Sequence, residues 1–347
     1  MQDKNAHKNF NSALSVTIIS TPPTLNAALE VWFIQNVLFS GAPCMTEFNP
    51  LNIGGDSVVY FEQYQIDRLT ISKMKSEGKK VILYHMGDEK GDKDISAYSQ
   101  CDLIIRNYFF PEIINNPELN GKIIWAPNGF RTGVGPRASH NLLGTLKRQH
   151  LSCFLGWLDN AASFNNERNN LSQVLLAWKK SKRKRAKTLW VWLKKYTSQS
   201  KEFISFSKAA IHCKNDLHLL SSDGFSNGYN VSLYSTVMEN SIFAPCPAGN
   251  SAETIRLYDA LELGCIPVML SHEFMHSKQA LGGIGAIPFP ILGSWSEFPE
   301  FLEKMKLKLE THPQEIEELQ RKCVEWWSNY KIFISKKITE SIEGLNT

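Results

Sequence analysis

The residues whose types and spacing offer the clearest chemistry lie between positions 243 and 270, where a turn containing Gly and Pro leads into a helix. Ser251 is a favourable N-cap, and apolar residues recur at helical spacing from Thr254 to Leu261. A glycine-containing turn that opens a helix presents backbone N–H groups and the positive end of the helix dipole, so this turn suits a phosphate. Arg256, in the first helical turn, can add a bidentate contact to a diphosphate.

Asp259 follows Arg256 by one turn, and its carboxylate can accept hydrogen bonds from a pair of ribose hydroxyls. A second interpretation is a surface ion pair between Arg256 and Asp259, which would contribute only about 0.2–0.5 kcal/mol. The spacing alone does not choose between the two.

A second group of chemically capable residues follows three predicted strands in the first half of the chain. In an open parallel sheet, ligands bind beyond the carboxyl ends of the strands, so these positions are candidate ligand contacts. The imidazole and the carboxylates among them are also capable of acid–base chemistry. The group is His85, Asp88, Glu89, Arg106, Asn128 and Gly129.

Each member of this group also has a structural interpretation. The two carboxylates can cap the next turn, His85 can be a hydrogen-bonded residue at a strand end, and Arg106 can form a structural ion pair. The dipeptide Asn128-Gly129 is first of all a turn signal.

The elements that position these residues alternate between strand and helix, which indicates parallel sheets with helical crossovers. In the first half, strands are predicted at 14–20, 56–61, 80–85, 102–106 and 122–126, and helices at 25–39 and 64–77. This pattern predicts a doubly wound lobe over residues 14–145. Residues 132–150, rich in Gly, polar and basic side chains, are interpreted as a linker.

A second α/β pattern follows and predicts another lobe over residues 151–312. Its strands are predicted at 151–157, 203–206, 241–244, 266–270 and 284–291, and its helices at 169–178, 229–239, 251–263 and 295–309. A last helix is predicted at 313–338, within a segment 313–347 that is long enough to return to the first lobe.

The composition fits a globular protein of two domains. The chain has 347 residues, of which 43% are hydrophobic and 21% charged, and a net charge of +4 that does not call for a nucleic-acid partner. No apolar run reaches the length of a membrane span, and the start lacks the pattern of a signal peptide. The 7 cysteines are dispersed, which is typical of free thiols in a reducing compartment.

One basic run stands out, at positions 179–187. It can be a nuclear signal, a contact for a phosphate-rich partner or a peripheral membrane patch, and its structural interpretation is a solvated helix end.

The segment PCPAGNSAETIRLYDALELGCIPVML, residues 245–270, resembles the donor-binding segment of the exostosin-like glycosyltransferases. Its Asn-x-x-Glu-Thr-x-Arg-x-Tyr-Asp-Ala pattern is most similar to the ribitol-phosphate xylosyltransferase branch. The resemblance implies an α/β fold of GT-B type, with two doubly wound, Rossmann-like lobes facing a cleft. It also implies an inverting transfer of a sugar from a nucleotide sugar.

The resemblance implies roles for the residues already named. The second lobe would bind the donor and the first would supply a general base, which is Asp88, Glu89 or His85. Phe154, Gly156 and Arg168 resemble the family's entry to the second lobe. The predicted substrate contacts are Gly249, Asn250, Ser251, Glu253, Thr254, Arg256, Asp259, Arg106, Asn128, Gly129 and Arg168.

The predicted reaction uses a UDP-sugar, such as UDP-xylose or a related hexose or uronate, and a hydroxyl of a glycan or polyol-phosphate acceptor. No cofactor and no metal are expected. The alternatives are a nucleotide-sugar epimerase or hydrolase of the same fold, and a non-catalytic protein that binds sugar nucleotides or polyanions through 179–187. We expect a cytoplasmic enzyme of microbial or viral origin if the chain is complete, and a Golgi enzyme if an N-terminal anchor has been removed.

Overall fold

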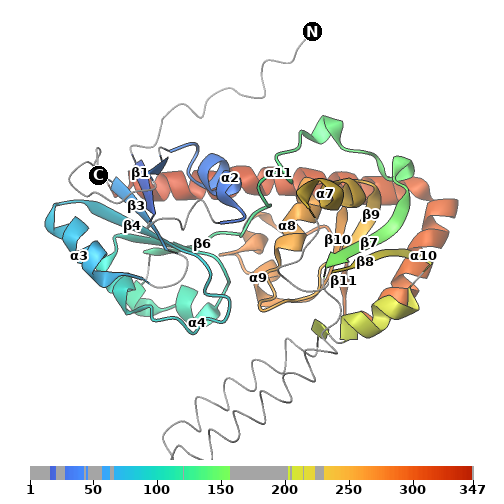
Figure 1. Cartoon of the computed structure of the whole chain (residues 1–347), viewed down its shortest axis with the longest axis horizontal. Coiled ribbons are helices and arrows are strands. Elements are labelled where there is room, and N and C mark those ends of the chain that lie inside the picture. Colours follow the sequence, from blue (N-terminus) through green and yellow to red (C-terminus); the bar gives the residue numbers. More distant parts are fainter. Residues whose placement is uncertain are drawn as a thin grey trace, which may run out of the picture. The chain divides into compact units, whose positions relative to one another are not determined.

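The computed structural model describes residues 16–20, 28–42, 44–45, 57–62, 66–119, 121–156, 202–203, 205–213, 215–222 and 230–345. The chain divides into two units (Figure 1). Unit 1 comprises Met1–Gly135, His272–Pro288 and Val324–Thr347, and unit 2 comprises Pro136–Ser271 and Phe289–Cys323. Arg168, the helix predicted at 169–178 and the basic run at 179–187 lie outside the described residues.

Unit 1 is built on a parallel sheet with strand order β2-β1-β3-β4-β5-β6. The strands are β1 (Val16–Ser20), β2 (Cys44–Met45), β3 (Ser57–Glu62), β4 (Lys80–His85), β5 (Leu103–Arg106) and β6 (Ile123–Trp125). Its helical segments include α2 (Val31–Phe33), which continues as a π-helix at Ile34–Leu38, then α3 (Arg68–Ser76), α4 (Pro111–Ile114) and α9 (Glu273–His276).

The central strands of this sheet are buried on both faces, as expected for runs of apolar residues between crossover helices. Val58, Val81 and Ile104 are fully inaccessible and belong to one hydrophobic cluster that also receives Ile71 and Met74 from α3. α3 begins with Asp67 as its N-cap and is followed by Gly78 at φ +76°, the left-handed position at which the sequence predicts the helix to end.

Unit 2 contains a second parallel sheet, with strand order β11-β10-β9-β7-β8. The strands are β7 (His150–Gly156), β8 (Leu217–Ser221), β9 (Ser241–Pro245), β10 (Ile266–Leu270) and β11 (Ile291–Leu292). The helices named here are α7 (Val231–Glu239), α8 (Ile255–Glu262) and α10 (Phe298–Thr311). Two parallel α/β units confirm the predicted fold class of two doubly wound lobes.

Two predicted strands differ from the structure. The segment predicted as a strand at 203–206 is helical at 202–203 and 205–212, because its aromatic residues pack as a helix face, with Phe206 between Phe154 and Trp295. The strand predicted at 284–291 shrinks to β11, preceded by a 3-10 turn at Leu281–Ile284. Strands β2 and β8 were not predicted from the sequence.

The stretch interpreted as a linker belongs to unit 2 from Pro136 onward. Arg148, only 7% exposed, donates to the backbone oxygens of Leu143, Ser241 and Leu263 at 2.8–3.0 Å. A guanidinium with five donors can satisfy several carbonyl groups at once, and this one fixes the segment to β9 and the end of α8.

The last helix, α11 (Pro313–Glu343), contributes residues to both units. In unit 2, Gln320 donates to the backbone oxygens of Leu143 and Gly264. In unit 1, Trp327 stacks on Phe33 with ring centroids 6.0 Å apart.

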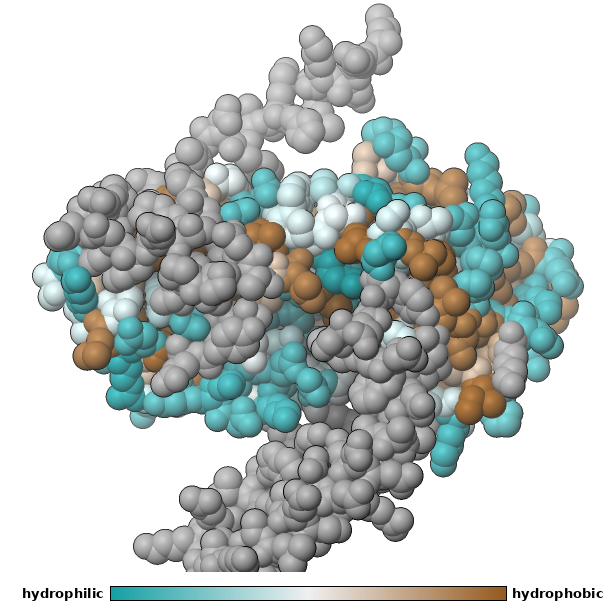
Figure 2. Space-filling view, viewed as in Figure 1, coloured by the Kyte–Doolittle hydropathy of each residue, from teal (hydrophilic) through white to brown (hydrophobic). Residues whose placement is uncertain are grey.

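Some apolar side chains remain at the surface of unit 2. Val231 and Leu233, near the start of α7, are 37% and 42% exposed, and Figure 2 shows hydrophobic residues on the visible face around this helix. Scattered exposed apolar residues are normal in folded proteins, so no function follows from them. None of the helices in the described part of the chain has the length and apolarity needed to cross a membrane.

Candidate functional site

The turn between β9 and α8 has the form that the sequence predicts, with one change at the helix start. Thr254, not Ser251, is the N-cap of α8, and its side chain accepts from the backbone N–H of Arg256 at 3.4 Å. Ser251 instead accepts from the backbone N–H of Glu253 at 3.3 Å, which tightens the turn before the helix begins. Ser, Thr and Asp all compete for such local bonds, so the exact cap is hard to choose from sequence.

This turn presents backbone donors at the surface. Gly249 and Asn250 are exposed, and the Gly249 N–H bonds back to the Ser251 oxygen at 3.0 Å. Within the described ranges, the backbone N–H groups of Asn250, Ser251 and Ala252 have no hydrogen-bond partner. Together with the N-terminus of α8, they form a set of donors suited to an anion.

Arg256 lies beside this turn, in the first turn of α8. Its guanidinium sits over the ring of Phe154, 4.2 Å from the centroid, and a Cβ on Gly156 would come within 2.8 Å of its Nη2. No carboxylate of a described residue lies within salt-bridge distance of it, so the predicted alternative of a surface ion pair with Asp259 is not formed. Asp259 is instead fully buried.

The topology of the sheet places these groups at a point that favours ligands. β7 is the first strand of unit 2, and β8 lies on one side of it and β9 on the other. The chain therefore runs from β7 to a neighbour on one side and then crosses to the other side, so the strand order reverses between β7 and β9. In open α/β sheets, ligands bind beyond the carboxyl ends of the strands at such a point. Gly156 ends β7 and the turn at Gly249 follows β9, so both border it.

Glu202 also contributes to this turn, and sequence reasoning missed it. Its Oε1 accepts from the backbone N–H of Ala248 at 2.9 Å and from the indole Nε1–H of Trp295 at 3.1 Å. The carboxylate therefore ties the start of the turn to the element before α10. Glu253, predicted as a substrate contact, is buried at 4% exposure.

In unit 1, the predicted residues come together at the carboxyl edge of the sheet. Strand register pairs Glu62 with His85 and His85 with Arg106, so these residues form one row across β3, β4 and β5. Asp88 and Glu89 follow β4 directly. The sequence therefore identified residues that are neighbours in the fold.

A buried network joins three of these side chains to Tyr98, which the sequence did not single out. Arg106, fully inaccessible, donates from Nη2 to Oδ2 of Asp88 at 3.1 Å and from Nη1 to the phenol oxygen of Tyr98 at 3.2 Å. The same phenol lies 2.7 Å from Nδ1 of His85. Asp88 is 1% exposed, and its Oδ1 accepts from the backbone N–H groups of residues 92 and 93 at 3.0 and 3.2 Å.

The electrostatics of this network keep His85 neutral. Burial, reinforced by the nearby Arg106 charge, lowers the pKa of His85 to about 4. Burial also raises the pKa of Tyr98, so its hydroxyl stays protonated. The network therefore contains one ion pair, Arg106 with Asp88, and two neutral groups.

Glu89 and Tyr108 lie outside this buried network. Glu89 is half-buried, and the Tyr108 hydroxyl donates to its Oε1 at 3.4 Å. Tyr108 adopts φ +56°, a left-handed conformation that is uncommon for a bulky residue.

The Asn128-Gly129 turn after β6 has a mainly structural environment. Asn128 is 2% exposed and accepts from the Asn107 side-chain amide at 2.6 Å. Gly129 adopts φ +77°, and a Cβ there would overlap the ring of Phe33. Only glycine fits this conformation and this contact.

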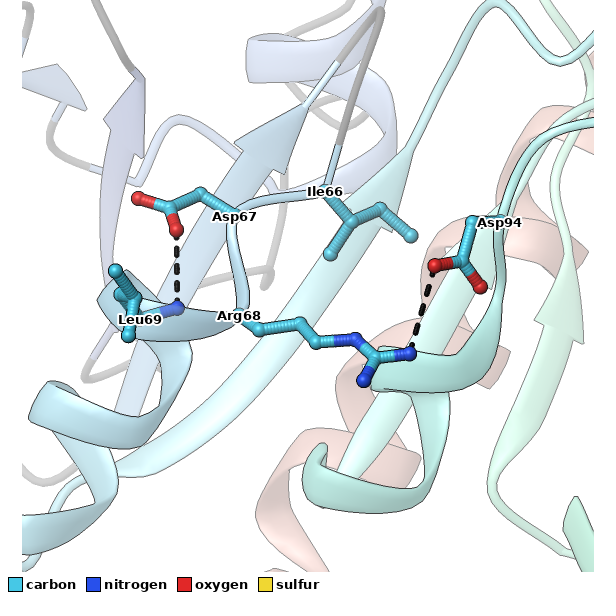
Figure 3. A pocket seen from close by; sticks show the side chains of 5 residues that line it. All are labelled: Ile66, Asp67, Arg68, Leu69 and Asp94. Atoms are coloured by element: carbon cyan, nitrogen blue, oxygen red, sulfur yellow. Dashed lines mark hydrogen bonds and ion pairs between the residues drawn. The ribbon is translucent and has the colours of Figure 1, made fainter.

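A separate pocket in unit 1 opens at the start of α3 (Figure 3). It has a volume of about 460 Å³ and is lined by Ile66, Asp67, Arg68, Leu69 and Asp94. Its charged groups serve the protein itself, because Asp67 accepts from the Leu69 N–H at 2.9 Å and Arg68 pairs with Asp94 at 3.4 Å. We assign no ligand to it.

Metal independence stays a prediction. The chain holds one Asp-x-Asp spacing, Asp92-Lys93-Asp94, a pattern that can bind metal ions in glycosyltransferases of a different architecture. Asp94 accepts from Ser96 and pairs with Arg68. Among the described residues, no group of three or more potential metal-ligating side chains gathers around a common point.

Comparisons with known proteins bear on the second half of the chain. Residues 154–280 match the Exostosin GT47 domain, and residues 225–345 match the RXYLT1 C-terminal domain. Both matches include the turn at Gly249 and Arg256. They confirm the resemblance to the exostosin-like glycosyltransferase family. Within that family, the second match indicates the ribitol-phosphate xylosyltransferase branch.

Individual relatives agree with this. Ribitol-5-phosphate xylosyltransferase 1 from Homo sapiens is 29% identical over 122 residues, and the Mus musculus protein is 29% identical over 125 residues. Each match covers 32% of this chain and 27% of the length of the relative.

Similar solved structures include three of low sequence identity. They are the catalytic domain of starch synthase IV from Arabidopsis thaliana bound to ADP and acarbose (TM-score 0.40, 11% identity, 83% of this chain and 73% of that chain), MurG from Acinetobacter baumannii (0.37, 10%, 92% and 99%) and a glycosyltransferase from Rickettsia africae ESF-5 (0.39, 11%, 93% and 98%).

Proposed function

We propose that this protein is a glycosyltransferase whose donor is a nucleotide sugar, with unit 2 binding the donor diphosphate. Arg256 carries the proposal, because it is an arginine with no ion-pair partner among the described residues, held against an aromatic ring beside unpaired backbone donors. The match to the Exostosin GT47 domain over residues 154–280 supports the same assignment.

The proposed chemistry needs charge stabilisation on the leaving group. As the bond between the anomeric carbon and the diphosphate oxygen breaks, negative charge develops on the nucleoside diphosphate. Arg256, the N–H groups of Asn250 and Ser251, and the N-terminus of α8 are positioned before the reaction to stabilise that charge. Unit 1 supplies the general base for the acceptor hydroxyl.

The finer assignment is a UDP-sugar donor and a polyol-phosphate or glycan acceptor, transferred with inversion. It is supported by the relatives on the matched branch, which are named for ribitol 5-phosphate and xylose. UDP-xylose and ribitol 5-phosphate are therefore the first substrates to test.

The test is a transfer assay with these two substrates that measures both UDP release and the pentosylated acceptor. We expect the unmodified chain to form both products. Arg256→Ala should lower kcat/KM by about 100-fold or more, because one preorganised donor to a developing anion is worth about that factor.

The matched control is Arg321→Ala, which removes an exposed arginine that pairs with Glu318 on the surface of α11. It should transfer at the unmodified rate. Equal activity in Arg256→Ala would contradict the proposal. UDP release without a glycosylated acceptor would favour a hydrolase.

A further inference from the structure

Three side chains at the carboxyl edge of the unit 1 sheet have the chemistry of a general base, and the structure distinguishes between them. A general base needs a lone pair that the acceptor hydroxyl can reach and that is not already committed to the protein. Asp88, Glu89 and His85 differ sharply in both respects.

Asp88 is committed to the fold. Its two oxygens accept three hydrogen bonds, from Arg106 Nη2 and from the backbone N–H groups of Asp92 and Lys93. At 1% exposure, it offers no surface to a substrate. Protonating it would also leave the Arg106 charge buried without its partner.

His85 is also unsuited to accept the proton. Tyr98 accepts a hydrogen bond from Arg106, so its own hydrogen is directed at Nδ1 of His85, 2.7 Å away. This arrangement assigns the ring hydrogen to Nε2, which is buried and has no partner among the described residues. Neither ring nitrogen then has a lone pair available to a hydroxyl.

Glu89 has both properties that the other two lack. Its side chain is partly exposed, and its one interaction within the described residues is the long hydrogen bond of 3.4 Å from Tyr108. Catalytic hydrogen bonds are often long before substrate binds. Tyr108 holds φ +56°, and strained backbone of this kind is retained where the surroundings enforce it, often at active sites.

We propose that Glu89 is the general base of the transfer reaction and that Tyr108 is the residue that positions it. The proposal rests on the proposed function. One carboxylate oxygen of Glu89 takes the proton of the acceptor hydroxyl as that oxygen bonds to the anomeric carbon. The electron pair of the donor C–O bond leaves with the nucleoside diphosphate, and Glu89 later releases its proton to water.

The experiment compares variants of the full chain in the assay with UDP-xylose and ribitol 5-phosphate. Glu89→Gln should lower kcat by 10²–10⁴-fold, the usual range for a general base. Its melting temperature and its stabilisation by UDP should match those of the unmodified protein. Glu89→Asp should recover part of the rate, and formate should partly restore Glu89→Ala.

Tyr108→Phe tests positioning, because it keeps the ring and removes the hydroxyl. We expect kcat to fall about 10- to 20-fold, near the lower end of the range for a lost hydrogen bond to a charged group, while KM for UDP-xylose is unchanged. If Tyr108 had only a structural role, Tyr108→Phe would lower the melting temperature of the protein, and kcat would not fall selectively while KM stayed constant. The matched control is Glu112→Gln on α4, an exposed carboxylate whose loss should change nothing.

Two outcomes would overturn the proposal in distinguishable ways. If the unmodified chain transfers and Glu89→Gln transfers equally well, the base assignment fails and the proposed function stands. If the unmodified chain neither transfers xylose nor is stabilised by UDP, the proposed function fails and takes the base assignment with it.

Discussion

At the residue scale, the candidate site of unit 1 is governed by one buried ion pair. Arg106 and Asp88 are 0% and 1% exposed and pair at 3.1 Å. Burying two charges costs much solvation, and the pair is tolerated because its remaining hydrogen-bonding groups are also satisfied. Both residues are therefore held by the fold in contacts that leave their side chains almost fully buried.

Removing one partner of this pair should therefore destabilise the fold. We expect Asp88→Asn to lower the free energy of unfolding by about 3–5 kcal/mol, because it leaves the Arg106 charge without compensation. Adding Arg106→Met should recover part of this loss. Urea unfolding of the two single variants and the double variant measures the coupling, and a loss below about 1 kcal/mol for Asp88→Asn would contradict the assignment.

His85 should make stability depend on pH in the acid range. Its pKa is about 4 in the folded protein and about 6.5 in an unfolded chain. Between these values the unfolded chain binds the extra proton, so folding is favoured above pH 6.5 and loses stability as the pH falls toward 4.

The matched measurement is urea unfolding at pH 7 and pH 5. The unmodified protein should lose roughly 2 kcal/mol more than His85→Gln over this interval, since the variant has no imidazole to protonate. Equal losses in the two proteins would show that His85 is not held neutral by the fold.

At the scale of elements, the central feature is the turn between β9 and α8. Its bounds follow from sequence, since Pro245, Gly249 and Gly264 mark the breaks and Gly264 adopts φ +66°. The residues that hold this turn in place cannot be identified from the sequence in the same way. Glu202, Phe154 and Gly156 lie 46 or more positions before Ala248 or Arg256, and no local pattern reports contacts of that kind.

Glu202 should position the turn for donor binding. Glu202→Ala removes the acceptor of the Ala248 N–H and of the Trp295 indole, so we expect Kd for UDP to rise about 10-fold. Glu202→Gln keeps the Oε1 acceptor and should bind UDP within about 3-fold of the unmodified protein. Isothermal titration measures both, and unchanged affinity in Glu202→Ala would separate Glu202 from the site.

At the scale of the whole molecule, the alternating pattern of strands and helices was enough to predict two parallel α/β units. Strands β4 and β10 have the predicted bounds, because each is a short apolar run between helix-ending glycines and polar turns. The segment at 203–206 was predicted wrongly, since a short aromatic run suits either a strand or a buried helix and only tertiary packing decides.

The candidate site was predictable to a similar degree. Position at a strand end identified His85, Asp88, Glu89 and Arg106 as neighbours, and the register of β4 with β5 agrees. Which of these side chains are committed to the fold, and which remain available to a substrate, depends on hydrogen bonds with Tyr98 and with backbone N–H groups after β4. Those contacts form only in the folded unit, so the sequence alone could not choose among the three candidates for the general base.

The most direct test of a diphosphate site at Arg256 is the affinity of the chain for UDP, measured also for Arg256→Ala and for the control Arg321→Ala. UDP at a hundred times its Kd should stabilise the unmodified protein and the control by about 2.7 kcal/mol, seen as a rise in Tm. Arg256→Ala should lose most of that rise. No stabilisation of the unmodified protein by UDP, or equal stabilisation of all three, would contradict a diphosphate site at Arg256.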